Sequence, residues 1–180
     1  MRRAFVVALL GAESTGKTTL AEALGAALRG RGDDVAVVGE YLREFCEAVG
    51  RTPRREEQRA IAAEQSRRID AAAAGAGVVV ADTSALMIAV YSDIVFGDTS
   101  LYEEAEAAHR RCDLTLLAAL DLPWLPDELR DGPHVRVPVD ERVVASLQRA
   151  QVGFTRIGGI GTARLENALR AIDAARARSA

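Results

Sequence analysis

Eight consecutive residues near the start of the chain match a pattern that binds phosphate. The pattern G-x-x-x-x-G-K-[ST] is met at every fixed position by Gly11-Ala12-Glu13-Ser14-Thr15-Gly16-Lys17-Thr18. Lys17 is the only lysine, so the other 22 of the 23 basic residues are arginine (23 less one). A loop that wraps a phosphate in its own N–H groups accommodates a compact ammonium better than a broad guanidinium. The segment is therefore predicted to be an ATP-binding P-loop.

The pattern assigns a task to each part of this loop. Backbone N–H groups of residues 13–18 would form an anion-binding nest at the start of the following helix. Lys17 would bridge the β- and γ-phosphates of ATP, and the Thr18 hydroxyl would hold Mg²⁺. The predicted ATP contacts are Gly11, Glu13, Ser14, Thr15, Gly16, Lys17, Thr18 and Thr19.

An acidic residue follows a buried apolar run further along the chain. Asp82 comes directly after Val78-Val79-Val80-Ala81, where a Walker-B aspartate would bind the Mg²⁺ shell. The alternative is that Asp82 caps the next helix, and we favour the metal role. Thr83 stands where mechanical ATPases usually place a water-activating Glu. The guanine-reading Asn-Lys-x-Asp motif of GTPases needs a second lysine, so phosphoryl transfer to a small molecule is favoured over hydrolysis.

A second acidic residue ends another predicted strand. Glu40 follows Val35–Val38 and Gly39, and opens the run Glu40-Tyr41-Leu42-Arg43-Glu44. A carboxylate on the γ-phosphate side of the cleft can accept the proton of an acceptor hydroxyl. The alternative is an acidic helix start favoured by the helix dipole. We favour the catalytic role.

Residues 121–138 form a segment rich in Pro, Asp and Arg, without clear periodicity. It is predicted to be a lid loop. Arg130 and Arg136 could stabilise charge on the transferring phosphoryl group, or could be solvated loop side chains. Trp124, the only tryptophan, either covers the site or pins the loop to the core. His109 and His134 are isolated in sequence and are assigned surface or loop roles.

Apolar runs and helical spacings predict the elements that carry these residues. Strands are predicted at Ala4–Leu10, Val35–Val38, Val78–Ala81, Leu114–Leu120 and Phe154–Ile157. Helices are predicted through Leu28 after the glycine loop, over Leu42–Val49, from Pro53 to about Ala74 with Thr52 as cap, from about Ala85, after a Ser100–Glu103 capping box, over Asp140–Arg149 and around Leu165–Ile172. Strands alternating with helices predict one three-layer α/β domain with a parallel sheet, covering residues 1–180.

Composition narrows the possible partners. The formal net charge is −3, and 27% of the residues are charged. No basic stripe of the kind that binds nucleic acid is visible, because the arginines mostly lie near acidic residues. No apolar stretch is long enough to span a membrane or to act as a signal peptide. Cys46 and Cys112 lack metal-ligand spacing and are expected to be reduced thiols in helices of a cytoplasmic protein.

Taken together, the motifs resemble the ribosylnicotinamide kinase domain of the NadR family over nearly the whole chain. The resemblance is carried by Gly11–Leu20, by Glu40-Tyr41-Leu42-Arg43-Glu44, by Asp82-Thr83, by Val90-Tyr91-Ser92, by Phe96-Gly97 and by Asp121-Leu122-Pro123-Trp124 with Asp127 and Leu129-Arg130. The P-loop is generic, whereas Glu-Tyr-x-Arg-Glu together with Asp-x-Pro-Trp is much more specific. Family members often carry a ring-stacking aromatic residue just before the Glu-Tyr pair, where this chain has Gly39.

The resemblance implies a P-loop NTPase fold like that of nucleoside and nucleotide kinases, with strand order 2-3-1-4-5 and a lid. It implies ATP- and Mg²⁺-dependent phosphorylation of a riboside 5′-hydroxyl, with nicotinamide riboside as the first expectation. Lys17, Glu40, Asp82, Arg130 and Arg136 are the expected catalytic residues. Glu40, Tyr41, Arg43, Tyr91 and Trp124 are expected on the substrate side, and Thr18 and Asp82 at the metal.

Two further functions stay open at this stage. One is a kinase for another nucleoside or cofactor precursor, and the other is an ATP-binding regulator without an acceptor substrate. The expected partner is a small riboside, not nucleic acid or a membrane. The oligomeric state is open, and a homodimer is one possibility. The family's adenylyltransferase motif His-x-Gly-His is not expected here, because the two histidines are far apart in sequence.

Overall fold

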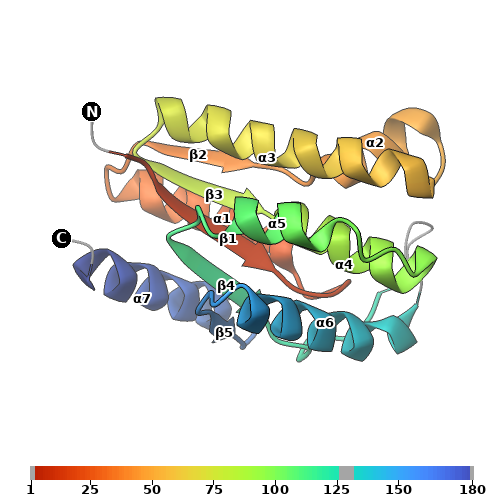
Figure 1. Ribbon diagram of the computed structural model, residues 1–180. Helices are drawn as coiled ribbons and strands as arrows, with labels where there is room; N and C mark the ends of the chain where they lie inside the picture. Colours follow the sequence, from red (N-terminus) through yellow and green to blue (C-terminus); the bar gives the residue numbers. More distant parts are fainter. Residues whose placement is uncertain (1–2, 126–131, 179–180) are drawn as a thin grey trace.

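The computed structural model, which describes residues 3–125 and 132–178, contains a five-stranded parallel sheet (Figure 1). Its strands pair in the order β2-β3-β1-β4-β5, as expected. The bounds are Phe5–Leu10 for β1, Val35–Val38 for β2, Val78–Asp82 for β3, Leu114–Ala118 for β4 and Thr155–Ile157 for β5. In the register of β1 with β3, Leu9 lies opposite Asp82. The end of β1, which leads into the P-loop, is thus level with the end of β3.

Helices cover both faces of this sheet. The α-helices span Lys17–Gly30 (α1), Tyr41–Val49 (α2), Gln58–Gly75 (α3), Ala85–Phe96 (α4), Tyr102–His109 (α5), Arg136–Arg149 (α6) and Thr162–Arg178 (α7). Two short 3₁₀ turns precede α3 and α6, at Arg55–Glu57 and Pro133–Val135. The three-layer α/β architecture expected from the alternating pattern is therefore confirmed.

The strands are apolar on both sides because each face is covered. Val7 and Leu9 pack with Leu24 of α1 and Ile172 of α7, while Leu10 packs on the other side with α3, α4, α5 and α6. Figure 1 shows the sheet between these two helical layers. The core is built from Ala, Val, Leu and Ile, and it holds the carboxyl ends of β1, β2 and β3 together at one edge.

Several predicted boundaries were wrong, and local polar contacts give the reasons. Helix α3 begins at Gln58, not at Pro53, because residues Arg55–Glu57 form a 3₁₀ turn, in which the Glu57 carboxylate accepts from the Arg54 N–H and forms an ion pair with Arg51. The contact between Glu57 and Arg54 caps the start of this turn, so Arg54 and not Thr52 is the N-cap residue. The predicted capping box before α5 is also wrong, since Leu101 occupies the N-cap position and no side chain caps the helix.

The predicted loop over residues 121–138 is too long at its C-terminal end. Helix α6 begins at Arg136, four residues before the predicted start at Asp140. Pro138 did not prevent this, because proline is tolerated within the first turn of a helix, where its missing N–H has no intrahelical partner. Arg136 therefore belongs to a helix. Arg130 lies outside the described residues.

The prediction for His109 was wrong. It is 1% exposed at the end of α5, where its ring is hydrogen-bonded to Ser84 Oγ at 3.0 Å and to Thr115 Oγ1 at 2.9 Å. Burial lowers the pKa of His109 to about 4. His109 thus links the start of α4 to β4. Cys46 is free in α2, whereas Cys112 is free but follows α5, so only one of the two thiols lies in a helix.

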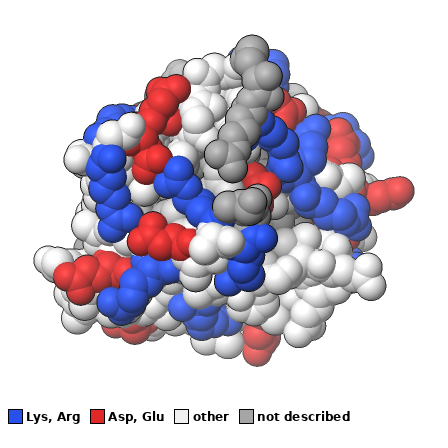
Figure 2. Space-filling model, turned by 90° about the vertical axis from the view of Figure 1, so that its left-hand side faces the viewer, with Lys and Arg blue, Asp and Glu red and all other residues white. Residues whose placement is uncertain are grey.

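Charges of both signs are interleaved over the surface. Figure 2 shows blue and red side chains alternating on the face at the left of Figure 1. Ion pairs join Arg3 to Asp113, Arg31 to Asp173 and Arg176 to Asp33. This mixture agrees with the expectation that arginines lie near acidic residues. None of the helices described here is long and apolar enough to cross a membrane.

Candidate active site

The glycine loop between β1 and α1 has the backbone needed to surround an anion. Gly11 has φ of +148° and Gly16 has φ of +73°, and a Cβ on Gly11 would lie 3.0 Å from Ala118 Cβ. Gly16 caps α1 without a side-chain hydrogen bond, and no acidic residue lies in the first turn. Thr15 and Lys17 close the loop by donating to Ala12 O at 2.7 and 2.9 Å. The helix start is therefore suited to a phosphate.

Thr18 and Asp82, 64 positions apart in sequence, meet beside this loop. Thr18 Oγ1 donates to Asp82 Oδ2 at 2.6 Å, and Asp82 is 2% exposed. The other carboxylate oxygen, Asp82 Oδ1, is buried without a hydrogen-bond partner in the described structure. Hydroxyl and carboxylate oxygens are the ligands that Mg²⁺ prefers, completed by water and substrate phosphates. These two side chains fit the expected metal. Among the described residues, no group of three or more His, Cys, Asp or Glu side chains is arranged so that it could hold a metal ion.

The turn after Asp82 is held under strain. Thr83 has φ of +78°, an uncommon value for a β-branched residue, and it is 1% exposed. Ser84 caps α4 by accepting a hydrogen bond from the Leu86 N–H at 3.3 Å. Since Ser84 performs the capping, the alternative role considered for Asp82 is not needed by this helix. Strain of this kind is concentrated at functional sites.

A cleft of about 610 Å³ extends from the glycine loop across the edge of the sheet. This size is within the range of small-molecule sites. One end is polar, and the wall of the cleft is largely apolar. Its lining includes Glu13, Ser14, Thr15, Gly16, Lys17, Thr18, Thr19, Glu40, Leu42, Arg43, Cys46, Gln58, Thr83, Met87, Tyr91, Phe96, Leu122 and Leu125.

The structure brings most of the predicted site residues into this cleft. Glu40, Arg43 and Tyr91 line it together with the P-loop residues 13–19. Asp82 is not part of the lining but reaches the site through Thr18. The start of the predicted lid is attached to the P-loop, because Leu125 N–H donates to Ser14 Oγ at 3.1 Å.

Three predicted residues are placed elsewhere. Tyr41 and Trp124 are not in the lining of the cleft, and the Tyr41 ring instead lies 4.4 Å from the Arg68 guanidinium. Trp124 is half-buried, with its indole Nε1 shielded from solvent. Arg136 at the start of α6 is also absent from the lining, and its Nε and Nη2 are buried without partners in the described ranges.

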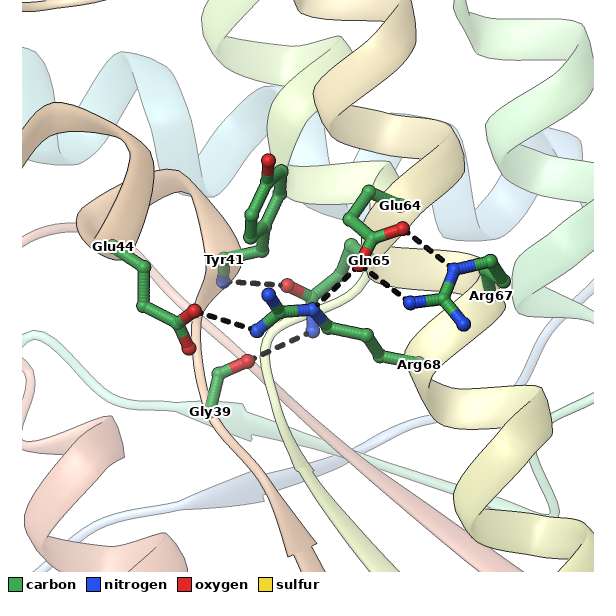
Figure 3. A network of polar contacts seen from close by, with 7 residues as sticks. All are labelled: Gly39, Tyr41, Glu44, Glu64, Gln65, Arg67 and Arg68. Atoms are coloured by element: carbon green, nitrogen blue, oxygen red, sulfur yellow. Dashed lines mark hydrogen bonds and ion pairs between the residues drawn. The ribbon is translucent and has the colours of Figure 1, made fainter. Parts of the chain in front are cut away.

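Sequence patterns missed a glutamine that holds the backbone on both sides of Glu40. Gln65 of α3 is fully buried and accepts from the Tyr41 N–H at 2.8 Å. Its amide also donates to Gly39 O at 3.2 Å, as Figure 3 shows. A glutamine inside a helix has no special spacing, so no sequence signal points to it.

A buried arginine behind the P-loop was also missed. Arg164 of α7 is 4% exposed and donates to Thr15 O at 2.9 Å and to Ala119 O at 3.3 Å. It also forms an ion pair with Asp121 at 2.8 Å, at the start of the predicted lid. The guanidinium therefore ties the outer side of the P-loop to the segment after β4.

This fold and glycine loop define the class of protein as a P-loop NTPase-like domain. The sequence model of a family described as an AAA domain matches residues 6–164, and the chain belongs to that family. No match was found among curated proteins.

Solved structures of the same fold include two of NadR protein. One is the crystal structure of NadR protein in complex with NAD and AMP-PNP, with a TM-score of 0.75 and 20% identity. The other is NadR protein in complex with NR, with a TM-score of 0.78 and 20% identity. Each comparison covers 95% of this chain, which corresponds to 49% and 50% of the NadR chains. The chain thus spans about half the length of these structures, and at this identity the likeness concerns the fold.

Proposed function

We propose that this protein is an ATP- and Mg²⁺-dependent kinase that phosphorylates a nucleoside-like alcohol, with nicotinamide riboside as the first acceptor to test. The observation that carries the proposal is the shared cleft, since Glu40 and Arg43 line the same space as Lys17 and Thr18. An acceptor and a nucleotide could meet there. The likeness to NadR structures, one of them described with NR, adds support for the choice of acceptor.

The polar end of the cleft supports ATP binding. N–H groups of the P-loop and the Lys17 ammonium would surround the β- and γ-phosphates. Thr18 and Asp82 would hold Mg²⁺, which when bound neutralises charge on the phosphate oxygens. The donors in place before the reaction lower the free energy of the charge that develops during transfer.

The apolar part of the lining supports an organic acceptor. Leu42, Met87 and Tyr91 provide apolar contact area in the same cleft as Glu40 and Arg43. In the proposed reaction the acceptor hydroxyl gives its proton to the Glu40 carboxylate while its oxygen bonds to the γ-phosphorus. The bond from that phosphorus to the bridging oxygen breaks, and ADP leaves with the electron pair. Lys17 would stabilise the negative charge that moves to the bridging oxygen.

One observation favours an acceptor other than nicotinamide riboside. A Cβ on Gly39 would contact only Glu44 Oε1, at 3.8 Å, so the backbone leaves room for a side chain that this chain lacks. A nucleoside that needs no stacking ring at this position is the second candidate acceptor.

The decisive experiment measures ADP release with ATP, Mg²⁺ and a panel of ribosides that includes nicotinamide riboside. We expect riboside-dependent ADP release, and Glu40→Gln should lower turnover by roughly 10²–10⁴ while the ATP Kd stays near that of the wild type. ATP binding without release of ADP above background for any riboside would refute the proposal and favour an ATP-binding regulator. An unchanged rate in Glu40→Gln would remove Glu40 from the role of base.

A further inference from the structure

We propose that Gln65 is a positioning residue that fixes Glu40 at the acceptor end of the cleft. This inference rests on the proposed function, in which Glu40 receives the acceptor proton. It goes further because Gln65 belongs to α3 and is itself absent from the lining of the cleft. Its effect would reach the acceptor only through the backbone that carries Glu40.

Gln65 forms hydrogen bonds with the backbone of both residues that flank Glu40. Its Oε1 accepts from the N–H of Tyr41, the residue after Glu40, at 2.8 Å. Its Nε2 donates to the carbonyl of Gly39, the residue before Glu40, at 3.2 Å. Gln65 is fully buried, so water cannot easily replace either bond. Figure 3 shows the Gln65 amide bonded to both backbone groups. Loss of either bond would leave a polar group with poor access to solvent.

The position of Glu40 at the start of its helix explains why this pair of Gln65 hydrogen bonds, the Gln65 clamp, matters. Glu40 is the N-cap residue of α2, with φ −74° and ψ 105°, yet its side chain makes no capping hydrogen bond. An N-cap side chain ordinarily satisfies an N–H in the first turn of its helix. Here Gln65 satisfies the N–H of Tyr41 from a neighbouring helix. That N–H belongs to the first helical residue, which an N-cap side chain does not ordinarily reach. The Glu40 carboxylate makes no capping hydrogen bond and lies in the lining of the cleft.

A charged bracket holds α3 against the start of α2. Arg68 lies about one helical turn after Gln65 on α3. It donates hydrogen bonds to Glu64 on its own helix at 2.8 Å and to Glu44 of α2 at 2.7 Å. Its guanidinium also lies 4.4 Å from the centre of the Tyr41 ring. Both side chains are labelled in Figure 3. This bracket is more exposed than Gln65, so it orients the two helices while the buried amide sets the backbone at Glu40.

The first test compares Gln65→Leu with Ser66→Ala, a neighbouring change on α3 that removes only a bond to Ala62 O of the same helix. We expect Gln65→Leu to lower kcat for the riboside by about 10²-fold, since misplacement near 1 Å has this scale of effect. The Kd for ATP should stay within about twofold of the wild-type value. Ser66→Ala should match the wild type in both. An equal loss of ATP binding and kcat would show a general structural defect and overturn the proposal.

A double-mutant cycle with Glu40→Gln tests whether Gln65 acts through Glu40. If it does, Gln65→Leu should change kcat by no more than about twofold in the Glu40→Gln background. Effects that multiply to a further loss of about 10²-fold would refute the positioning role while leaving the proposed function intact. A wild-type protein that phosphorylates no riboside would refute the proposed function, and the role of Gln65 with it.

A second variant, Gln65→Glu, keeps the size of the side chain in case Gln65→Leu does not fold. A neutral carboxyl can still donate to Gly39 O, whereas a carboxylate can only accept. The charged groups on the two helices that meet here include Glu40, the N-cap residue of α2, Glu44 of α2, and Glu64 and Arg68 of α3. We expect the kcat of Gln65→Glu, relative to wild type at the same pH, to rise as the pH falls. A ratio that does not change with pH would contradict the proposed clamp.

Discussion

Replacing Arg164 by methionine should test how strongly the buried guanidinium supports the P-loop. The change removes four hydrogen bonds, to Thr15 O, Ala119 O, Gly159 O and Asp121 Oδ1. Removing one partner of a buried ion pair costs about 3–5 kcal/mol. The Asp121 side chain is 37% exposed, so solvent would partly compensate its charge and the cost should lie near about 3 kcal/mol. For a chain of this length, that loss corresponds to a Tm lower by roughly 6–12 °C.

The assay is thermal unfolding with and without ATP and Mg²⁺. Arg156→Met is the matched control, because Arg156 pairs with Asp140 at 2.8 Å but its side chain is 42% exposed. An exposed pair contributes about 1 kcal/mol or less, so the control should lower the Tm by no more than roughly 2–4 °C. The rise in Tm on adding ATP should be smaller in Arg164→Met than in Arg156→Met. Equal Tm losses in the two variants would refute the assignment of Arg164 as a support of the P-loop.

Three further changes test other parts of the molecule. Lys17→Arg keeps the charge but should raise the Kd for ATP by about tenfold or more. A titration that gives wild-type affinity would disprove the argument that the loop accommodates an ammonium but not a guanidinium. Burial lowers the pKa of His109 from 6.5 to about 4 in the folded protein. Between pH 6.5 and about 4 the unfolded state therefore binds more protons than the folded state, and the free energy of unfolding falls as the pH drops through this range. Urea unfolding should show that His109→Gln removes about 3 kcal/mol of this pH dependence, and an unchanged slope would contradict the assigned pKa. Gly39→Trp should lower the KM for nicotinamide riboside by about 2- to 10-fold through ring stacking, and a higher KM would indicate that the acceptor is held differently.

The predicted site residues that the structure brings together belong to continuous segments or to strand ends. The P-loop residues follow one another in the sequence. Gly11 and Gly16 adopt positive φ angles, which favour glycine. Asp82 and Glu40 could be placed because buried parallel strands end at a common edge of the sheet. The sequence therefore predicted that Asp82 lies at the same sheet edge as the P-loop, and in the structure Thr18 Oγ1 of that loop lies 2.6 Å from Asp82 Oδ2.

The errors fall where a distant side chain determines the local structure. His109 appeared isolated because its partners Ser84 and Thr115 lie on two other elements. The contact of the Tyr41 ring with Arg68 of α3 was not predicted either, although the role of Tyr41 toward a substrate stays a prediction. Neither contact has a sequence spacing that distinguishes it from chance.

The sequence by itself determined the phosphate-binding loop, the alternation of strands and helices, and the acidic residues at the strand ends. These follow from local backbone geometry and from apolar patterns that any buried parallel sheet requires. Only the tertiary structure decided that Gln65 bonds to the backbone next to Glu40 and that Arg164 donates to the carbonyl of Thr15 in the P-loop. The physical reason is that a buried polar group must be satisfied by whichever donor or acceptor the packing brings near it, and packing joins residues that the sequence keeps far apart.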